Sequence, residues 1–159
     1  MKTILSVISI SLLLVVNTGC LKGDDPCTPK SVQSEQAAIL AYASANGIVG
    51  TSHPSGIYYE ILNAATGPQA TSSSTVTVNY VGKFISNNTV FDQTTPATGP
   101  VSFALNGVIA GWQTAIPLAA KGQTIKMIIP SSLAYGCTGF RTIPPDEVLF
   151  FEVTLVDVQ

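Results

Sequence analysis

Histidine and cysteine, which often serve as proton carriers, thiol nucleophiles and metal ligands, are few in this sequence of 159 residues: it has one histidine and three cysteines. The one histidine, His53, stands among serines and a proline, a turn-like context typical of an exposed loop. A His-rich metal site and a Ser–His–Asp triad both need a histidine set among partners. We therefore expect no metal site, no hydrolytic triad and no cofactor.

The three cysteines, Cys20, Cys27 and Cys137, form no CxxC motif, so they give little support for a zinc site or for thioredoxin-like chemistry. Cys27 and Cys137 could pair in an oxidising compartment. Because Cys27 stands in a stretch with the composition of a mobile linker, we expect these two thiols to stay unpaired.

The remaining candidates are aromatic and acidic residues in four stretches. They are Val78-Asn79-Tyr80-Val81-Gly82, then Val90-Phe91-Asp92, then Leu105-Asn106-Gly107-Val108-Ile109-Ala110-Gly111-Trp112, and last Ile129-Pro130 with Leu133-Ala134-Tyr135-Gly136, Ile143-Pro144-Pro145 and Leu149-Phe150-Phe151-Glu152-Val153. In this order, and with fitting gaps, they resemble the V-x-Y-x-G, F-D, L-G-x-V-I-x-G-W and later motifs of the FKBP family of macrolide-binding prolyl isomerases. One such motif alone would mean little, whereas the ordered set covers about residues 56–159.

The resemblance implies a pocket in which X–Pro peptide bonds rotate. Trp112 would form its floor, Asp92 and Tyr135 would supply polar contacts, and Ile109 would offer its backbone N–H. Apolar walls would come from Tyr80, Phe91, Val101, Val108, Ile109, Ile143 and Phe151. Without the ordered set of motifs, each aromatic residue would be interpreted as a core residue. Asp92 alone would be interpreted as a turn residue, and Tyr135 alone as part of a loop.

The sequence also departs from the commonest family pattern. Val101 stands where many members have an aromatic residue, and the loop 93–100 has no arginine to pair with the pocket acid. The loop 136–143 is one residue shorter than usual, and Phe140 or Arg141 takes the place of a frequent histidine. We expect these changes to affect catalytic strength, substrate preference and macrolide affinity but not the fold.

The elements that must position these residues are mostly strands. Period-two alternation over 75–84 puts Val76, Val78 and Tyr80 on one face. Other strands are predicted over 57–62, 90–92, 101–105, 124–129 and 148–158. One helix is predicted over 111–120, short or loosened at its first turn because Pro117 lacks a backbone donor. Too few helices separate the strands for a doubly wound sheet. We therefore predict an α+β fold, and the resemblance implies a twisted antiparallel β-sheet half-wrapped around one short helix.

The first nineteen residues read as a lipoprotein signal peptide. The apolar stretch 4–16 is too short to span a bilayer, which takes about 20 residues. Residues 17–20, Asn-Thr-Gly-Cys, resemble the lipobox of bacterial lipoproteins, which implies cleavage before Cys20 and lipidation of that cysteine. An ordinary secretory signal and an uncleaved anchor are the alternatives.

Residues 20–33 read as a lipidated tether, and Asp24-Asp25 resembles a surface-export signal. Residues 34–55 are expected to hold a short helix and a connector before the isomerase domain at 56–159. Ser34 is the expected N-cap, and Asn46-Gly47 ends the helix. Its apolar stripe would pack against the domain or serve as a spacer.

The formal net charge is −2 and no basic run occurs, so the sequence lacks the electrostatic footprint of nucleic-acid binding. The resemblance implies a prolyl isomerase acting on Pro-containing polypeptides among exported proteins, with macrolides as inhibitors. It would be lipid-anchored to the outer membrane of a Gram-negative bacterium, on the periplasmic side or at the surface. A proline-loop-binding chaperone or adaptor with little turnover is the alternative, and a structural surface lipoprotein is a third.

Overall fold

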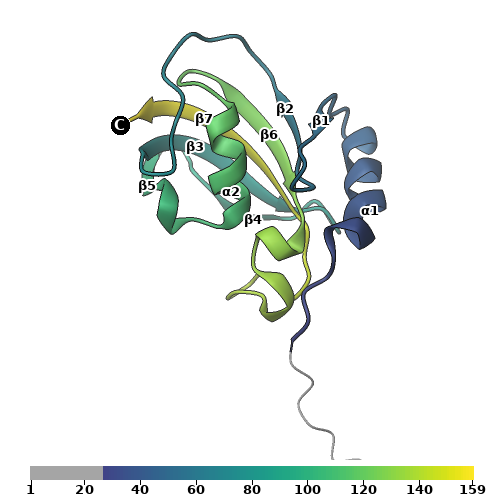
Figure 1. Cartoon of the computed structure of the whole chain (residues 1–159). Coiled ribbons are helices and arrows are strands. Elements are labelled where there is room, and N and C mark those ends of the chain that lie inside the picture. Colours follow the sequence, from purple (N-terminus) through teal and green to yellow (C-terminus); the bar gives the residue numbers. More distant parts are fainter. Residues whose placement is uncertain (1–26) are drawn as a thin grey trace, which may run out of the picture.

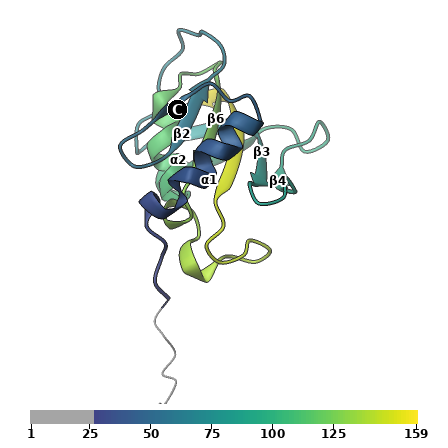
Figure 2. The same ribbon diagram turned by 90° about the vertical axis from the view of Figure 1, so that its right-hand side faces the viewer.

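One seven-stranded antiparallel sheet organises residues 27–159, the part of the chain that this computed structural model describes. The strand order is β1-β2-β6-β7-β3-β4, and β5 also pairs with β3. The strands are β1 (Thr51–Ser52), β2 (Tyr58–Ile61), β3 (Thr75–Phe84), β4 (Val90–Gln93), β5 (Val101–Ala104), β6 (Thr124–Ile129) and β7 (Leu149–Val158). Helix α2 (Ala110–Ala115) covers one face and α1 (Val32–Ala45) the other (Figures 1 and 2). This arrangement confirms the predicted α+β fold. The predicted leader, Cys20 and the tether up to residue 26 lie outside the described residues.

Strand β3 has the bounds that its alternation predicted, and Val76 and Val78 are fully buried beneath α2. It pairs with β7 along nearly its whole length and with β4 and β5 on its other side. Apolar side chains from the inner face of the sheet, with Leu105, Ala115 and Ile116, form the main core. The core lies between the sheet and α2, so the start of α2 is fixed against the sheet.

The predicted helix over 111–120 divides into two pieces. The α-helix ends at Ala115, and residues Ile116–Leu118 continue as a 3-10 turn, η2. Pro117 explains the change, because its missing N–H cannot continue the α-helical bonding. Gly111 lets the helix lie close to the sheet, since a Cβ there would come 2.3 Å from the Ile129 side chain. The helix is thus short, as predicted, and tightly seated.

Helix α1 begins earlier than predicted. Its N-cap is Ser31 rather than Ser34, because the Ser31 hydroxyl accepts a hydrogen bond from the Ser34 N–H at 3.3 Å. It ends at Asn46, as expected. Its buried stripe packs against the outer face of the sheet in a second cluster of Ile39, Tyr42, Ala43, Ile48, Ile128, Val148 and Phe150. The helix therefore packs against the domain and is not a spacer.

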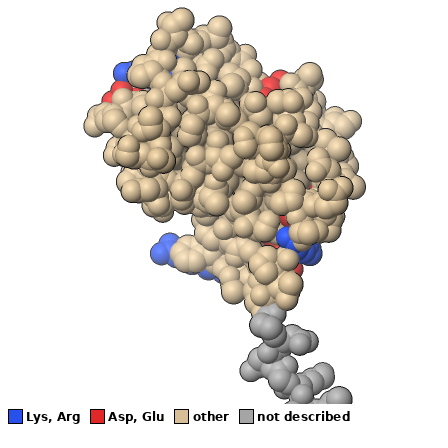
Figure 3. Space-filling view, viewed as in Figure 1, with Lys and Arg blue, Asp and Glu red and all other residues tan. Residues whose placement is uncertain are grey.

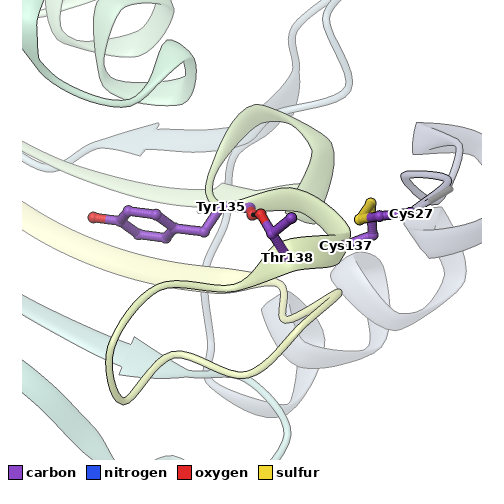
Figure 4. Close-up of a disulfide and its surroundings, with 4 residues drawn as sticks. All are labelled: Cys27, Tyr135, Cys137 and Thr138. Atoms are coloured by element: carbon purple, nitrogen blue, oxygen red, sulfur yellow. Dashed lines mark hydrogen bonds between the residues drawn. A yellow bond between two sulfur atoms is a disulfide. The ribbon is translucent and has the colours of Figure 1, made fainter. Parts of the chain in front are cut away.

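Cys27 and Cys137 form a disulfide, which contradicts the prediction of two unpaired thiols. The Cα atoms lie 5.6 Å apart across 110 residues of chain, and Figure 4 shows Cys27 beside Cys137 in the loop that follows β6. His53 lies in a turn but is half-buried rather than exposed, and its ring Nδ1 lies 2.9 Å from the Ser55 hydroxyl.

Residues 27–159 contain no helix long and apolar enough to cross a membrane. Within the same range, no three His, Cys, Asp or Glu side chains gather in a way that could hold a metal ion. The face seen in Figure 3 carries only a few, scattered charged side chains.

Candidate functional site

A cavity of about 370 Å³ opens between the start of α2, the inner face of β3 and β7, and the loop after β6. Its volume lies within the range of small-ligand pockets. Aromatic rings dominate the lining, which consists of Tyr80, Phe91, Asp92, Phe103, Gly107, Val108, Ile109, Trp112, Tyr135, Phe140 and Phe151.

Trp112 forms the floor of this cavity. Its side chain is only 4% exposed and meets Tyr80, Phe103 and Phe151 edge to face, with ring centroids 5.3–5.8 Å apart. Such near-perpendicular pairs are the favoured geometry for aromatic rings. Three neighbours from β3, β5 and β7 therefore fix the orientation of the indole. The indole N–H is buried and has no hydrogen-bond partner within residues 27–159.

Phe91 makes one wall, and a glycine on the neighbouring strand makes room for it. The ring packs edge to face on Phe151 at 5.6 Å and stacks on Phe84 at 4.9 Å. A Cβ at Gly82 would lie 2.7 Å from the Phe91 ring and 2.8 Å from the Phe151 ring. This contact gives a physical reason for the glycine of the Y-x-G motif, since any side chain there would push two wall rings apart.

Asp92 and Tyr80 form a hydrogen-bonded pair at the rim. The Tyr80 hydroxyl donates to Asp92 Oδ2 at 2.6 Å. The pKa of Tyr80 is raised well above its usual value, mainly by burial. The hydrogen bond to Asp92 and the negative charge of Asp92 raise it further. The loop 93–100 contains no arginine, and Tyr80 is the donor that holds the exposed Asp92 carboxylate in place.

Tyr135 reaches the cavity from the loop between β6 and β7. Its ring stacks on Phe140 at 5.3 Å with an angle of 10° between the ring planes. The Arg141 guanidinium lies 5.1 Å from the centroid of the Phe140 ring. Burial and the negative charge of Asp92 raise the pKa of Tyr135, while Arg141 acts to lower it. Phe140, not Arg141, thus lines the cavity where the family often has a histidine.

The backbone just before α2 presents a donor to the same space. Ile109 is the N-cap of α2, and its carbonyl accepts the N–H of Trp112 at 3.0 Å. The preceding carbonyl, that of Val108, accepts the Gln113 side-chain amide at 2.8 Å. The Ile109 N–H itself has no acceptor among residues 27–159, so it is open to a ligand carbonyl.

The structure brings most of the predicted site residues to this one cavity. The eight that line it are Tyr80, Phe91, Asp92, Val108, Ile109, Trp112, Tyr135 and Phe151. Two predicted wall residues are not in the lining. Ile143 is buried in the core, and the short side chain of Val101 packs against that core without reaching the cavity.

Phe103, Phe140 and Gly107 line the cavity but were not predicted to do so, although Phe140 was one of two candidates for the position of the usual histidine. Phe103 lies two residues beyond Val101 on the same face of β5, so strand alternation offered a signal for it. Its larger ring reaches Trp112 and Tyr80, which a valine cannot do.

Comparison with known proteins identifies the family. Residues 67–156, more than half of the chain, match the sequence model of FKBP-type peptidyl-prolyl cis-trans isomerase. The chain belongs to this family. The FKBP match contains all the cavity-lining residues and leaves out α1, β1 and β2.

This FKBP chain is similar to two curated relatives. One is named as an outer membrane protein, and the other is named as an FKBP-type isomerase. The outer membrane protein MIP of Legionella longbeachae is 39% identical over 135 residues, which cover 82% of this chain and 57% of that protein. FkpA of Escherichia coli K12, an FKBP-type isomerase, is 39% identical over 118 residues, which cover 74% of this chain and 43% of FkpA. The chain therefore spans about half the length of these relatives.

Solved structures show the same fold. The crystal structure of FkpA from Escherichia coli superposes with a TM-score of 0.68 at 34% identity, covering 80% of this chain and 62% of FkpA. A peptidyl-prolyl cis-trans isomerase from Pseudomonas syringae gives a TM-score of 0.67 at 30% identity, covering 83% of this chain and 98% of that one. The FKBP fold thus extends beyond the matched range into the first strands.

Proposed function

We propose that this protein is a peptidyl-prolyl cis/trans isomerase that acts on X–Pro bonds of polypeptides in the bacterial cell envelope. The observation that carries the proposal is the aromatic cavity over Trp112, with Asp92 and Tyr135 at its rim. Family membership supports it, and so do the names of the relatives.

The chemistry requires no nucleophile. Rotation about an X–Pro bond breaks amide resonance, and the barrier is roughly 18–20 kcal/mol. The planar amide is more dipolar than the twisted one, so an apolar pocket solvates the planar ground state less well than water does. A cavity walled by aromatic rings can hold the proline ring on Trp112 while the preceding carbonyl turns. Groups placed for the twisted geometry then stabilise the transition state selectively.

In this proposal three polar groups of the chain act in that way. The Ile109 N–H is available to donate a hydrogen bond to a carbonyl oxygen of the substrate. The Tyr135 hydroxyl is a second donor, because a tyrosine is protonated at neutral pH and burial raises the pKa of this one further. The Asp92 carboxylate, oriented by Tyr80, supplies negative charge beside the twisting amide. No step transfers a proton.

We further propose that the chain is attached to the outer membrane through a lipid on Cys20 and meets its substrates among exported proteins. The lipobox-like residues before Cys20 support this, as does the name of the Legionella relative, outer membrane protein MIP. The Cys27–Cys137 disulfide also supports it, since disulfides persist in oxidising compartments. Macrolides that mimic proline would bind the same cavity as inhibitors.

A comparison of wild type with Asp92→Asn tests the proposal, using a protease-coupled cis/trans assay on X–Pro peptides. Asp92→Asn should remove one transition-state contact of about 1–3 kcal/mol. This loss corresponds to a decrease in kcat/KM on the order of 5- to 150-fold. The substitution nearly conserves volume, so the melting temperature should stay within a few degrees. If the asparagine variant matches an active wild type, Asp92 is structural only. A wild type that is inactive on every X–Pro peptide would refute the isomerase function and leave a proline-loop-binding module.

A further inference from the structure

The loop that carries Tyr135 pairs with no strand of the sheet, although Leu133, Ala134 and Tyr135 pack against the main core. It leaves β6 at Pro130 and makes two 3-10 turns, η3 (Ser131–Leu133) and η4 (Gly136–Thr138), on either side of Tyr135. Most of its hydrogen bonds are internal, such as the Thr138 hydroxyl to the Tyr135 carbonyl at 3.2 Å. The Gly136 carbonyl accepts the N–H of Asp146, which lies in the next stretch of loop. Something other than strand pairing must therefore hold Tyr135 in place.

The first attachment of this loop runs to α1. The Glu35 carboxylate accepts the Ser131 backbone N–H at 2.9 Å and the Ser131 hydroxyl at 2.7 Å. Glu35 is 5% exposed and Ser131 is fully buried. Glu35 also stands in the first turn of a fourteen-residue helix, where the helix dipole favours negative charge. Removing this carboxylate would leave a buried N–H and a buried hydroxyl without their partner, at a free-energy cost that favours displacement of the loop.

The second attachment is covalent. The disulfide joins Cys137, two residues after Tyr135, to Cys27, four residues before the N-cap Ser31. Figure 4 shows that the Tyr135 ring and the disulfide extend in opposite directions from the same short loop. The two attachments, at Ser131 and at Cys137, thus lie on both sides of Tyr135 in the sequence. Both partners, Cys27 and Glu35, come from the segment before residue 67, outside the family match.

We propose that Cys27 and Glu35 are positioning residues for prolyl isomerisation, which hold the loop 131–138 so that Tyr135 faces the cavity. The inference rests on the proposed isomerase function. It assigns to the N-terminal segment a role that neither the cavity lining nor the family motifs contain. A displacement of about 1 Å of a positioned group can cost on the order of 100-fold in rate, so a loosened loop is sufficient to reduce turnover.

The test uses the full chain purified in detergent, and it measures cis/trans exchange of an X–Pro peptide by NMR, which needs no coupling protease. We expect the phosphine reductant TCEP to lower wild-type kcat/KM roughly 3- to 30-fold, mainly through kcat. The double variant Cys27→Ser/Cys137→Ser should show the same loss without reductant and no further change with it. This variant is the matched control for other effects of TCEP.

Glu35 is tested by two substitutions and one packing control. Glu35→Ala should lower kcat, whereas Glu35→Gln, which keeps one acceptor oxygen, should retain more of it. Ile39→Val weakens the packing of the same helix without touching the loop, and it should lower the melting temperature while leaving kcat unchanged. Wild-type kcat/KM in the reduced, still folded protein would overturn the positioning role of the disulfide. Equal kcat losses in Ile39→Val and Glu35→Ala would show that Glu35 acts through stability alone.

Hydrogen exchange separates this inference from the isomerase function. Reduction or Glu35→Ala should speed amide exchange in residues 131–140 and leave β3 and β7 unchanged. If wild type proves inactive on peptides, the isomerase function fails, and the exchange data still decide whether Cys27 and Glu35 hold the loop. Unchanged protection of the loop after reduction would reject the inference even in an active enzyme.

Discussion

Replacement of Tyr80 by phenylalanine isolates one atom of the site, the hydroxyl that donates to Asp92. The bond is short, 2.6 Å, and its acceptor is a carboxylate. A hydrogen bond to a charged group contributes about 1.5–3 kcal/mol when buried. Asp92 is exposed, so solvent screening reduces this, and we expect Tyr80→Phe to lower the free energy of unfolding by only ~0.5–1.5 kcal/mol.

The same change should affect catalysis, because the loop 93–100 offers Asp92 no arginine. Without the Tyr80 hydroxyl the carboxylate is free to rotate away from the cavity. We expect kcat/KM to fall by roughly 3- to 10-fold, which corresponds to about 0.6–1.4 kcal/mol. The Phe ring keeps its edge-to-face packing on Trp112, so binding of an apolar proline mimic should change little.

A double-mutant cycle with Asp92→Asn gives the decisive comparison, measured by isomerase assay and urea unfolding. If Tyr80 acts through the carboxylate, its effect on kcat/KM should be smaller in the Asp92→Asn background, with a coupling of about 0.5–1.5 kcal/mol. Tyr58→Phe is the matched control, since its hydroxyl bonds to Gly50 far from the cavity. Equal effects of Tyr80→Phe in both backgrounds would refute the idea that Tyr80 works by orienting Asp92.

Three further predictions concern the core, the pH profile and the anchor. Trp112→Ala should lower the free energy of unfolding by about 3–5 kcal/mol in urea titrations, because the indole is buried among three rings. Tyr80 and Tyr135 have raised pKa values, so their hydroxyls stay protonated and kcat/KM should be flat from about pH 6 to 9, as a pH series will show. Because folding favours these protonated hydroxyls, their contribution to stability is complete below the unfolded pKa of about 10 and is lost above it in alkaline melts. Cys20→Ser should abolish lipidation and membrane attachment in cell fractionation; a variant that partitions like wild type after the same cleavage would contradict the lipoprotein prediction.

The sequence predicted strands well where alternation was strict. The range 75–84 coincides with β3, because its alternation places every second side chain in a core that only one register can satisfy. The range 124–129 also coincides with β6, which ends before Pro130, although Ile128 and Ile129 are both buried. The start of α1 was predicted wrongly, at Ser34 instead of Ser31, since two serines three residues apart are both acceptable N-caps. The choice between them depends on where the preceding chain runs, which the disulfide to Cys137 fixes.

The parts of the site that the sequence missed depend on tertiary contacts. The Cys27–Cys137 pairing joins residues 110 positions apart, and linker composition gave no sign of it. Glu35 looked like an ordinary residue at the start of a helix, and only the fold shows that it reaches Ser131. Phe103 was missed because the family pattern has its aromatic residue at the position of Val101. Only the ring of Phe103 is large enough to reach the cavity and contact Trp112.

The most direct test of the central claim is the cis/trans exchange rate of an X–Pro peptide, measured by two-dimensional NMR with substoichiometric protein. This single sample reports both binding, as shifts of the peptide resonances, and turnover, as exchange cross-peaks between the cis and trans forms. The account predicts an exchange rate that rises in proportion to protein concentration and falls in Asp92→Asn. Peptide that binds while its exchange rate stays at the uncatalysed value would contradict it.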